Sequence, residues 1–432
     1  MNLSNKLREL IFFQIDKIKG NKISNHLKDL ESFNNINEDS FVVEQDTRLE
    51  KILNYASKNC EFYKNFDKLS SFPIINKQII KNNESEFLSK EFELENLNPV
   101  VTSGSTGTPF RVYHDTNKIL RNTADTIYFA KKASFNIGDP LYYLKIWNKF
   151  NIKSPLQQKA QNVFPINVFD LSHQNIKKYI EQWNKSKTSI SILGYVSAIL
   201  EISKYISKNE HLKRFKVHST ITMSEGLDDS SRKLISNAMN CDVYARYSNV
   251  ENGIIAQQYN SSNQFLINSS SYKVEIFKIE EDKIEKEGNI GRIVITDFFN
   301  FGMPIIRYDT GDLGSMKRII SHNKVVEIIE KIEGRRMDAI YDTNGNLLSS
   351  YVITNGMWDF SEINQYQFIQ KSKTSYSFKL SINEKFEKEG ELIDEFRKYL
   401  GKDAIIDVEY NNNIPLLSSG KRKKVVNLMT EK

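Results

Sequence analysis

The chain has 432 residues and a formal net charge of +6, and 39% of its residues are hydrophobic while 11% are aromatic. At about 150 residues per domain, this length predicts two or three domains. The aromatic content excludes an intrinsically disordered chain, because enough large side chains are present to build a core. The net charge is small and residues of both signs are mixed along the whole chain, which argues against a nucleic-acid partner.

The cysteines and histidines point to no disulfide framework and no metal site. Cys60, Cys241 and six histidines lie far apart in the sequence, whereas metal ligands and disulfide scaffolds show close, regular spacings. The apolar run 10–13 is followed by Gln14 and Asp16 and by no small-residue cleavage site. This pattern argues against a signal peptide and against a membrane span, so we expect a cytoplasmic protein.

The N-terminal hundred residues predict helices, and the next region predicts alternating strands and helices. Leu3, Leu7, Leu10 and Ile11 follow a helical period, as do apolar residues within 49–55, which predicts surface helices packed on a larger body. The elements expected next are strands at 141–147 and 189–193 and a helix at 196–206. Alternating strands and helices indicate an α/β fold.

The second half of the chain adds antiparallel structure. Segments 272–279 and 292–296 predict two strands of a hairpin joined by the charged segment 280–289. After Gly334 we expect strands at 365–370 and 376–382, a helix at 389–400 and a strand at 405–410. The fold class is therefore mixed α/β and α+β. A large N-terminal domain, 1–334, would contain sheets and packed helices, and 335–432 would form a small mobile α+β domain.

The segment 102–109, with the sequence TSGSTGTP, carries the most chemical information. Its two glycines allow the backbone to turn sharply and approach a ligand, and its hydroxyls and amides can donate to phosphate oxygens. Apolar strands flank it on both sides. It lacks the lysine of a Walker-type phosphate loop, so taken alone it suits either a polyphosphate site or a polar hairpin turn.

Four more segments follow in chain order: 246–253 (RYSNVENG), 306–314 (IRYDTGDLG), 334–338 (GRRMD) and 419–421 (SGK). Together with the glycine-rich segment they resemble, in the same order, the motifs of the adenylate-forming ligases. The resemblance covers nearly all of the chain beyond residue 90. Segments 194–198, 222–227, 303–308 and 365–367 are similar to phenylacetate-CoA ligase and its capsule-polysaccharide relatives.

This resemblance implies an ATP- and Mg²⁺-dependent enzyme. Such a ligase joins a carboxylic acid to AMP with release of pyrophosphate, and then transfers the acyl group to a thiol or an amine. CoA, a carrier-protein thiol and an amino sugar remain open as acceptors. Segment 342–346 is more similar to the capsule relatives than to the CoA ligases, which also suggests a role in surface polysaccharide biosynthesis.

The resemblance assigns a role to each matching residue. Lys421 would bridge the substrate carboxylate and the α-phosphate, Glu251 would be catalytic and would hold magnesium, and Asp338 would lie in the hinge between the domains. Asp312 would bind the ribose hydroxyls, and Tyr247 would lie against adenine. The full expected nucleotide-binding set is Ser103, Gly104, Ser105, Thr106, Gly107, Thr108, Ser224, Glu225, Gly226, Tyr247, Arg307, Asp312 and Arg335.

Each assignment has a structural alternative. Lys421 could belong to a solvated basic tail, Asp312 could form a turn, and Glu251 could begin a helix. The two arginines, Arg307 and Arg335, could pair with structural carboxylates instead of phosphates. Tyr247 could be an ordinary core residue, and 224–226 could be a helix cap leading into 228–229. The acid pocket is expected around 147–148, Tyr195 and the residues after Ser224.

Three positions depart from the family motifs. Ser248 replaces a glycine, Val250 replaces a hydroxyl residue near the phosphates, and Met337 replaces the first hinge aspartate. The lost hydroxyl at 250 is the most serious departure. A degenerate, noncatalytic nucleotide-binding protein is therefore one alternative, and a polysaccharide-assembly partner acting through an amphipathic first helix is another.

Overall fold

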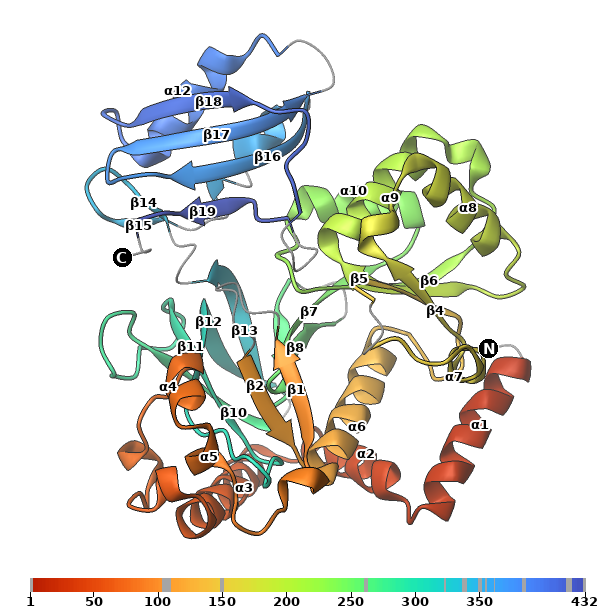
Figure 1. The fold of residues 1–432 in the computed structure, drawn as a ribbon, viewed down its shortest axis with the longest axis vertical. Coiled ribbons are helices and arrows are strands. Elements are labelled where there is room, and N and C mark those ends of the chain that lie inside the picture. The colour runs from red at the N-terminus through yellow and green to blue at the C-terminus, as the bar shows by residue number, and fades with distance from the viewer. Residues whose placement is uncertain are drawn as a thin grey trace.

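The computed structural model describes residues 3–102, 110–147, 151–259, 263–321, 324–335, 340–348, 352–353, 356–360, 362–382, 386–416 and 422–429. In Figure 1 the C-terminal strands form a body of their own above two lobes built from the rest of the chain. The described structure is a mixed α/β fold with large and small sheets, which confirms the expected fold class.

The N-terminal region is helical, as expected. Its helices are α1 (Leu3–Ile18), α2 (Lys22–Phe33), α3 (Glu38–Asn59), α4 (Lys77–Asn82) and α5 (Glu84–Phe87). Helix α3 begins where the Asn37 side chain accepts a hydrogen bond from the Ser40 amide, and it buries one apolar stripe that includes Ile52 and Ala56. The prediction of packed helices is confirmed for α3. It is wrong for Leu3, Leu7, Leu10 and Ile11 of α1, whose side chains are exposed, although Phe12 and Phe13 of this helix are partly buried.

A short antiparallel hairpin carries the glycine-rich segment. Strand β1 (Asn98–Thr102) pairs with β2 (Phe110–His114), so that Thr102 stands opposite Phe110. The flanking strands were predicted, whereas the loop 103–109 lies outside the described residues. Helix α6 (Thr116–Lys132) follows directly, and the Asp115 side chain accepts a hydrogen bond from Lys118 N at its start.

Five parallel strands form one half of an eleven-stranded sheet within the described chain. They are β3 (Leu141–Lys145), β4 (Val163–Asn167), β5 (Ile190–Tyr195), β6 (Val217–Met223) and β7 (Val243–Asn249), in the spatial order β4-β3-β5-β6-β7. The connections include α7 (Pro155–Gln161), α8 (His173–Asn184), α9 (Val196–Lys208) and α10 (Asp229–Met239). Trp183, Ile199 and Ile235 pack between the helices and the strands in one apolar cluster. The predicted β3, β5 and α9 are confirmed.

The other half of the sheet is antiparallel. It contains β8 (Gly253–Gln258), β9 (Phe265–Ile267), β10 (Tyr272–Phe277), β11 (Gly291–Asp297), β12 (Tyr308–Ser321) and β13 (Lys324–Arg335), in the order β10-β11-β12-β13-β9-β8. Tyr272 stands opposite Asp297, which confirms the predicted hairpin. Strand β8 pairs with β7, so the two halves meet there.

The C-terminal part has its own apolar core. Strands β14 (Ile340–Tyr341) and β15 (Leu347–Leu348) pair with each other, and β16 (Ile363–Gln370), β17 (Ser375–Ile382), β18 (Ile405–Tyr410) and β19 (Val425–Asn427) form a four-stranded sheet. Phe368, Phe378 and Phe396 pack this sheet against α12 (Glu389–Leu400). The predicted elements are confirmed, and the domain boundary at 334 stays a prediction. Among the helices described, none has the length and apolar character needed to cross a bilayer.

Candidate active site

The carboxyl ends of the parallel strands gather several predicted site residues. Leu144, Gly194, Thr222 and Ala245 stand side by side across β3, β5, β6 and β7. The chain therefore leaves these strands at one edge, where it continues into Trp147, Tyr195, Ser224 and Tyr247. In open α/β sheets this edge is the usual ligand-binding position. The segments expected to form the acid pocket share this edge with the expected adenine-binding segment.

Close packing at this edge depends on Gly194. A Cβ atom at this position would lie 2.6 Å from Leu144 Cβ and 2.8 Å from the Leu144 carbonyl oxygen. Both distances are shorter than van der Waals contact allows, and the carbonyl belongs to the backbone. A side chain at 194 would thus push β3 and β5 apart directly beneath the candidate site.

Tyr247 joins the two halves of the sheet at the predicted nucleotide site. Its hydroxyl donates to Asp312 Oδ2 at 2.8 Å, and it lies 3.3 Å from Thr310 Oγ1. Burial, and then the negative charge of Asp312, raises the pKa of Tyr247 well above its ordinary value. The phenol therefore stays protonated and holds the Asp312 carboxylate in one orientation. Gly311, between these residues, has a φ of +77°, which glycine adopts at low cost.

Glu251 is buried in the connection between β7 and β8, and its side chain contacts residues from two other elements. Glu251 Oε1 accepts a hydrogen bond from the Tyr308 hydroxyl at 3.0 Å and lies 2.8 Å from Lys77 Nζ. Glu251 is 2% exposed, whereas the Lys77 side chain is 45% exposed. Sequence reasoning missed Lys77, because no local pattern connects the start of α4 with Glu251.

The backbone of Glu251 lies against the hairpin that carries the glycine-rich loop. Its carbonyl oxygen accepts from His114 Nε2 at 2.7 Å, and His114 is the last residue of β2. Burial, followed by the charge of Lys118, lowers the pKa of His114. The ring is thus neutral near pH 7, with its proton on Nε2. This hydrogen bond holds Glu251 and the hairpin together.

Glu225 connects the large lobe to the C-terminal segment. Its Oε2 accepts from the Ser197 amide at 2.7 Å, and its Oε1 accepts from Ser197 Oγ at 3.0 Å and from the Arg422 amide at 3.0 Å. Ser224, the preceding residue, has a φ of +68° and turns the chain at the end of β6. Arg422 directly follows the predicted catalytic Lys421, so the terminal segment reaches the carboxyl edge of the sheet.

A second contact strengthens this connection. Lys424 Nζ lies 3.0 Å from Asp228 Oδ2, and the Asp228 side chain also accepts from Ser231 N at the start of α10. Burial alone would raise the pKa of Asp228, but the Lys424 ammonium and the hydrogen bonds from Ser231 and Ser230 outweigh it and lower the pKa. Asp228 is therefore ionised near neutral pH and pairs with Lys424.

The two candidate arginines have different environments. Arg307 donates to Glu275 Oε1 at 2.9 Å and to Oε2 at 3.2 Å, and its guanidinium lies over the Phe277 ring. This is the structural pairing that the sequence left open as an alternative to phosphate binding. Arg335 is the backbone partner of Asp312 across β12 and β13, which brings these two candidate residues to one place in the sheet. The side chain of Arg335 is not among those described.

Several expected site residues lie outside the described residues. These are Ser103, Gly104, Ser105, Thr106, Gly107, Thr108, Asp338 and Lys421, and their roles stay predictions. Val250 is described and is half exposed, beside the buried Glu251. Gly226 has open space where a Cβ would lie.

The Glu251 carboxylate fits a magnesium site in which the substrate supplies most of the ligands, rather than a metal site made of protein side chains alone. In the part of the chain that is described, no three His, Cys, Asp or Glu side chains gather into a metal-ligand cluster. Magnesium usually keeps several waters and takes one or two carboxylates together with substrate phosphates. A single buried carboxylate, next to the hairpin strand that ends at His114, fits that pattern.

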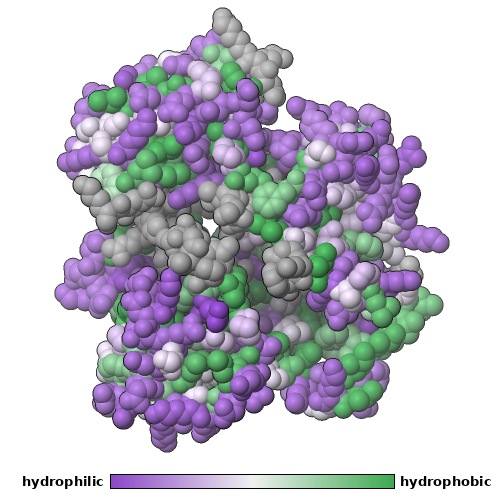
Figure 2. All heavy atoms as spheres, viewed as in Figure 1, coloured by the Kyte–Doolittle hydropathy of each residue, from purple (hydrophilic) through white to green (hydrophobic). Residues whose placement is uncertain are grey.

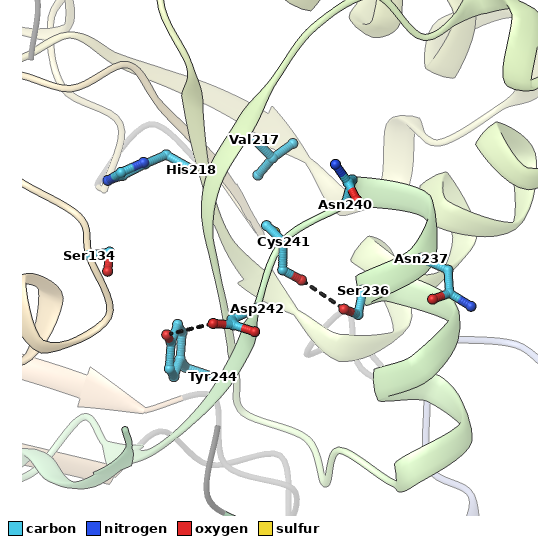
Figure 3. A pocket seen from close by; sticks show the side chains of 9 residues that line it. All are labelled: Ser134, Val217, His218, Ser236, Asn237, Asn240, Cys241, Asp242 and Tyr244. Atoms are coloured by element: carbon cyan, nitrogen blue, oxygen red, sulfur yellow. Dashed lines mark hydrogen bonds between the residues drawn. The ribbon is translucent and has the colours of Figure 1, made fainter. Parts of the chain in front are cut away.

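A separate hollow lies at the opposite edge of the parallel strands. It has a volume of about 630 Å³, and its lining includes His218 near the start of β6 and Asp242 just before β7. Figure 3 shows Tyr244 and Asp242 on one side and the hydrogen bond between Ser236 Oγ and the Cys241 carbonyl on the other. Because the candidate site uses the carboxyl ends of the same strands, this hollow is a different place.

Known proteins share this architecture. Residues 340–428 match the family described as the CapK C-terminal domain. The chain is 24% identical over 412 residues to Protein CapK of Staphylococcus aureus, which covers 89% of this chain and 88% of that protein. A structure of 2-hydroxyisobutyryl-CoA ligase, in the postadenylation state with 2-HIB-AMP, superposes with a TM-score of 0.68 at 13% identity over 88% of both chains. The amide bond synthetase McbA from Marinactinospora thermotolerans gives 0.52 at 13% identity, covering 77% of this chain and 68% of McbA.

The chain thus has the fold of the adenylate-forming ligases. The resemblance inferred from the motifs is confirmed at this level, and the matches to Protein CapK and to the CapK C-terminal domain agree with it. The same 2-hydroxyisobutyryl-CoA ligase in its thioesterification state gives a lower TM-score of 0.56.

Proposed function

We propose that this chain is an ATP-dependent ligase that activates a carboxylic acid as an acyl-adenylate. The observation that carries the proposal is the contact of the Glu225 carboxylate with both Ser197 and the Arg422 amide. This contact brings the segment next to Lys421 to the carboxyl edge of the sheet, where Tyr247 and Asp312 lie. A catalytic lysine on the terminal segment would thereby meet a nucleotide bound by residues of the large domain.

In the first step, a carboxylate oxygen of the acid attacks the α-phosphorus of ATP. A new P–O bond forms, the bond to the bridging oxygen breaks, and pyrophosphate leaves. Both reactants are anions, so the site must bring them together and neutralise them. Lys421 would contact both groups, and the amides and hydroxyls of 103–108 would hold the phosphates.

Other residues would orient the nucleotide. Asp312, fixed by the Tyr247 hydroxyl, would accept hydrogen bonds from the ribose hydroxyls, and Arg335 would add a cationic donor beside it. Ser224, Glu225 and Gly226 would border adenine together with Tyr247. Mg²⁺, when bound at Glu251, would neutralise charge on the leaving pyrophosphate. Arg307, already paired with Glu275, would support the site through its position rather than by binding phosphate directly.

In the second step, the sulfur of a thiol or the nitrogen of an amine attacks the acyl carbonyl. The bond from the carbonyl carbon to the AMP oxygen breaks, AMP leaves, and the acceptor loses a proton. Lys421 must withdraw to make room, so we propose a rotation of the small domain, 335–432, about the segment containing Asp338. CoA, a carrier-protein thiol and an amino sugar are the candidate acceptors. The similarity to CapK supports a role in surface polysaccharide biosynthesis.

The proposal is tested by ATP–pyrophosphate exchange with magnesium and pooled carboxylic acids, followed by mass spectrometry for acyl-AMP. We expect exchange that depends on an added acid, and a thioester or amide once an acceptor is supplied. ATP binding without any exchange would indicate a degenerate nucleotide-binding protein instead. Carbohydrate binding without nucleotide binding would favour a polysaccharide-assembly partner.

A further inference from the structure

The first helix, α1, exposes most of its apolar side chains, whereas Phe12 and Phe13 are partly buried. The residues Leu3, Leu7, Leu10, Ile11, Ile15 and Ile18 are between 48% and 85% exposed. In Figure 2, hydrophobic residues line the edge of the molecule where Figure 1 places α1. A surface helix of a globular protein normally turns its apolar stripe towards the core, so α1 is inverted.

Buried polar contacts hold α1 in this orientation. Asn5 Nδ2 donates to Asp139 Oδ1 at 3.0 Å, and Asp16 accepts from the amides of Ile23 and Ser24, both at 2.9 Å. Asn5 is 3% exposed and Asp16 is 4% exposed. Asp16 thereby satisfies the free amides at the start of α2. The polar side of α1 is specifically attached to the protein, and the apolar side is presented to the surroundings.

Cationic side chains border the apolar side of α1 on both edges. At about 100° per residue, the six exposed apolar residues fall within an arc of about 140°, which also contains the polar residues Ser4 and Gln14. Lys6 and Lys17 follow one edge of this arc and Arg8 follows the other, and Lys19 comes directly after the last residue of α1. The two acids of the helix, Glu9 and Asp16, lie on the side turned towards the protein. Long cationic side chains at such borders can extend their charges into a polar interface while their stems cover apolar surface.

We propose that α1 docks this protein on an anionic lipid surface. An apolar arc with lysine and arginine on its flanks matches a helix that lies in the plane of the interface, where leucine and isoleucine enter the acyl region and the cations meet lipid phosphates. A second copy of the chain is a poorer occupant. Face-to-face packing of two α1 helices would bring the cationic borders of one copy close to those of the other.

Co-sedimentation with vesicles tests the proposal on the full chain. Vesicles of phosphatidylglycerol and phosphatidylcholine in equal parts should sediment the protein, and vesicles of phosphatidylcholine alone should sediment much less of it. Binding to the anionic vesicles should weaken as salt is raised, because exposed charges are screened beyond about 10 Å at 0.1 M ionic strength. Absence of binding to both kinds of vesicle overturns the proposal.

Two pairs of substitutions separate the apolar and the charged contributions. Leu7→Gln with Ile11→Gln should weaken partitioning onto vesicles at least about tenfold. Two side chains that would enter the acyl region become polar, so the favourable free energy of moving them out of water is lost. Lys6→Gln with Lys17→Gln should remove the preference for anionic vesicles. Ile320→Gln, at a position on β12 that is 55% exposed, is the matched control and should bind like the parent.

The result for the variants also distinguishes a protein partner from a membrane. All substituted side chains are exposed, so thermal unfolding should stay close to that of the parent, and circular dichroism checks this. Analytical ultracentrifugation then reports the oligomeric state without lipid. A dimer that dissociates in the Leu7→Gln, Ile11→Gln variant would assign the surface to a second copy and overturn the lipid proposal, as would unchanged vesicle binding by both variants.

Discussion

Lys77 and Glu251 form an ion pair in which the ammonium lies 2.8 Å from the carboxylate oxygen Oε1. The pair places a protein cation on the carboxylate that we propose as the magnesium ligand. We expect lysine and magnesium to compete for Glu251 in the absence of nucleotide, because both would contact the same carboxylate. The competition makes Lys77 a positioning residue whose removal should affect metal dependence before it affects chemistry.

We expect Lys77→Met to lower the magnesium concentration that gives half-maximal ATP–pyrophosphate exchange, by about three- to tenfold, since a half-exposed ion pair contributes about 1 kcal/mol. Lys81→Met, on the same helix α4, is the control and should leave the magnesium titration unchanged. A raised magnesium requirement in Lys77→Met would contradict competition and would instead indicate that Lys77 helps to bind the phosphates.

Tyr247→Phe tests whether the Tyr247 hydroxyl positions Asp312 for ribose. The variant keeps the ring and loses the 2.8 Å hydrogen bond to Oδ2. Losing one hydrogen bond to a charged group costs about 1.5–3 kcal/mol, so we expect the KM for ATP to rise about tenfold or more while kcat changes little. Tyr244→Phe is the control, because Tyr244 lies near the other end of β7 and its hydroxyl donates a long hydrogen bond of 3.4 Å to Asp242. A fall in kcat at constant KM would place the tyrosine in the chemical step instead.

The sequence predicted those features that depend on local patterns. Helix α12 spans 389–400 and β18 spans 405–410, as the periodicity indicated, and the Tyr272–Asp297 pairing follows from two strands joined by a charged turn. What could not be predicted depends on distant partners. Arg307 looks the same in sequence whether it meets phosphate or Glu275, and the exposure of the apolar side of α1 depends on Asp139 and Ser24.

Lys421→Ala should separate the two half-reactions. We expect acid-dependent pyrophosphate exchange to fall by about 10²-fold or more, because a charge contact specific to the transition state is lost. Transfer from supplied acyl-adenylate to the acceptor should stay near the parent rate, because the proposed rotation withdraws the lysine before this step. Lys423→Ala is the control for loss of one positive charge from this segment, and this variant should keep the pyrophosphate exchange activity of the parent. Equal loss of both half-reactions in Lys421→Ala would count against the domain rotation.

The Asp228–Lys424 pair predicts a pH-dependent contact between the terminal segment and α10. The pKa of Asp228 is lowered from its ordinary value of 3.8, so its contribution to stability is present above about pH 4 and is lost as the pH falls through the lowered pKa. Burial would lower the pKa of Lys424, but the nearby Tyr366 and Asp228 raise it, so the ammonium stays charged across this range. The contact should therefore hold from about pH 4 through neutral pH and release in stronger acid.

Asp228→Asn isolates this charge pair, because the asparagine oxygen can still accept the hydrogen bond from Ser231 N at the start of α10. We expect the protection factors of the amides at 422–427, which correct for the intrinsic pH dependence of exchange, to fall at pH 7 to the values that the parent reaches only in acid, where Asp228 is protonated. Asp229→Asn, an exposed neighbour on the same helix, should exchange like the parent. If 422–427 stays equally protected in Asp228→Asn, the contact is held by Glu225 and the Arg422 amide rather than by the Lys424 charge.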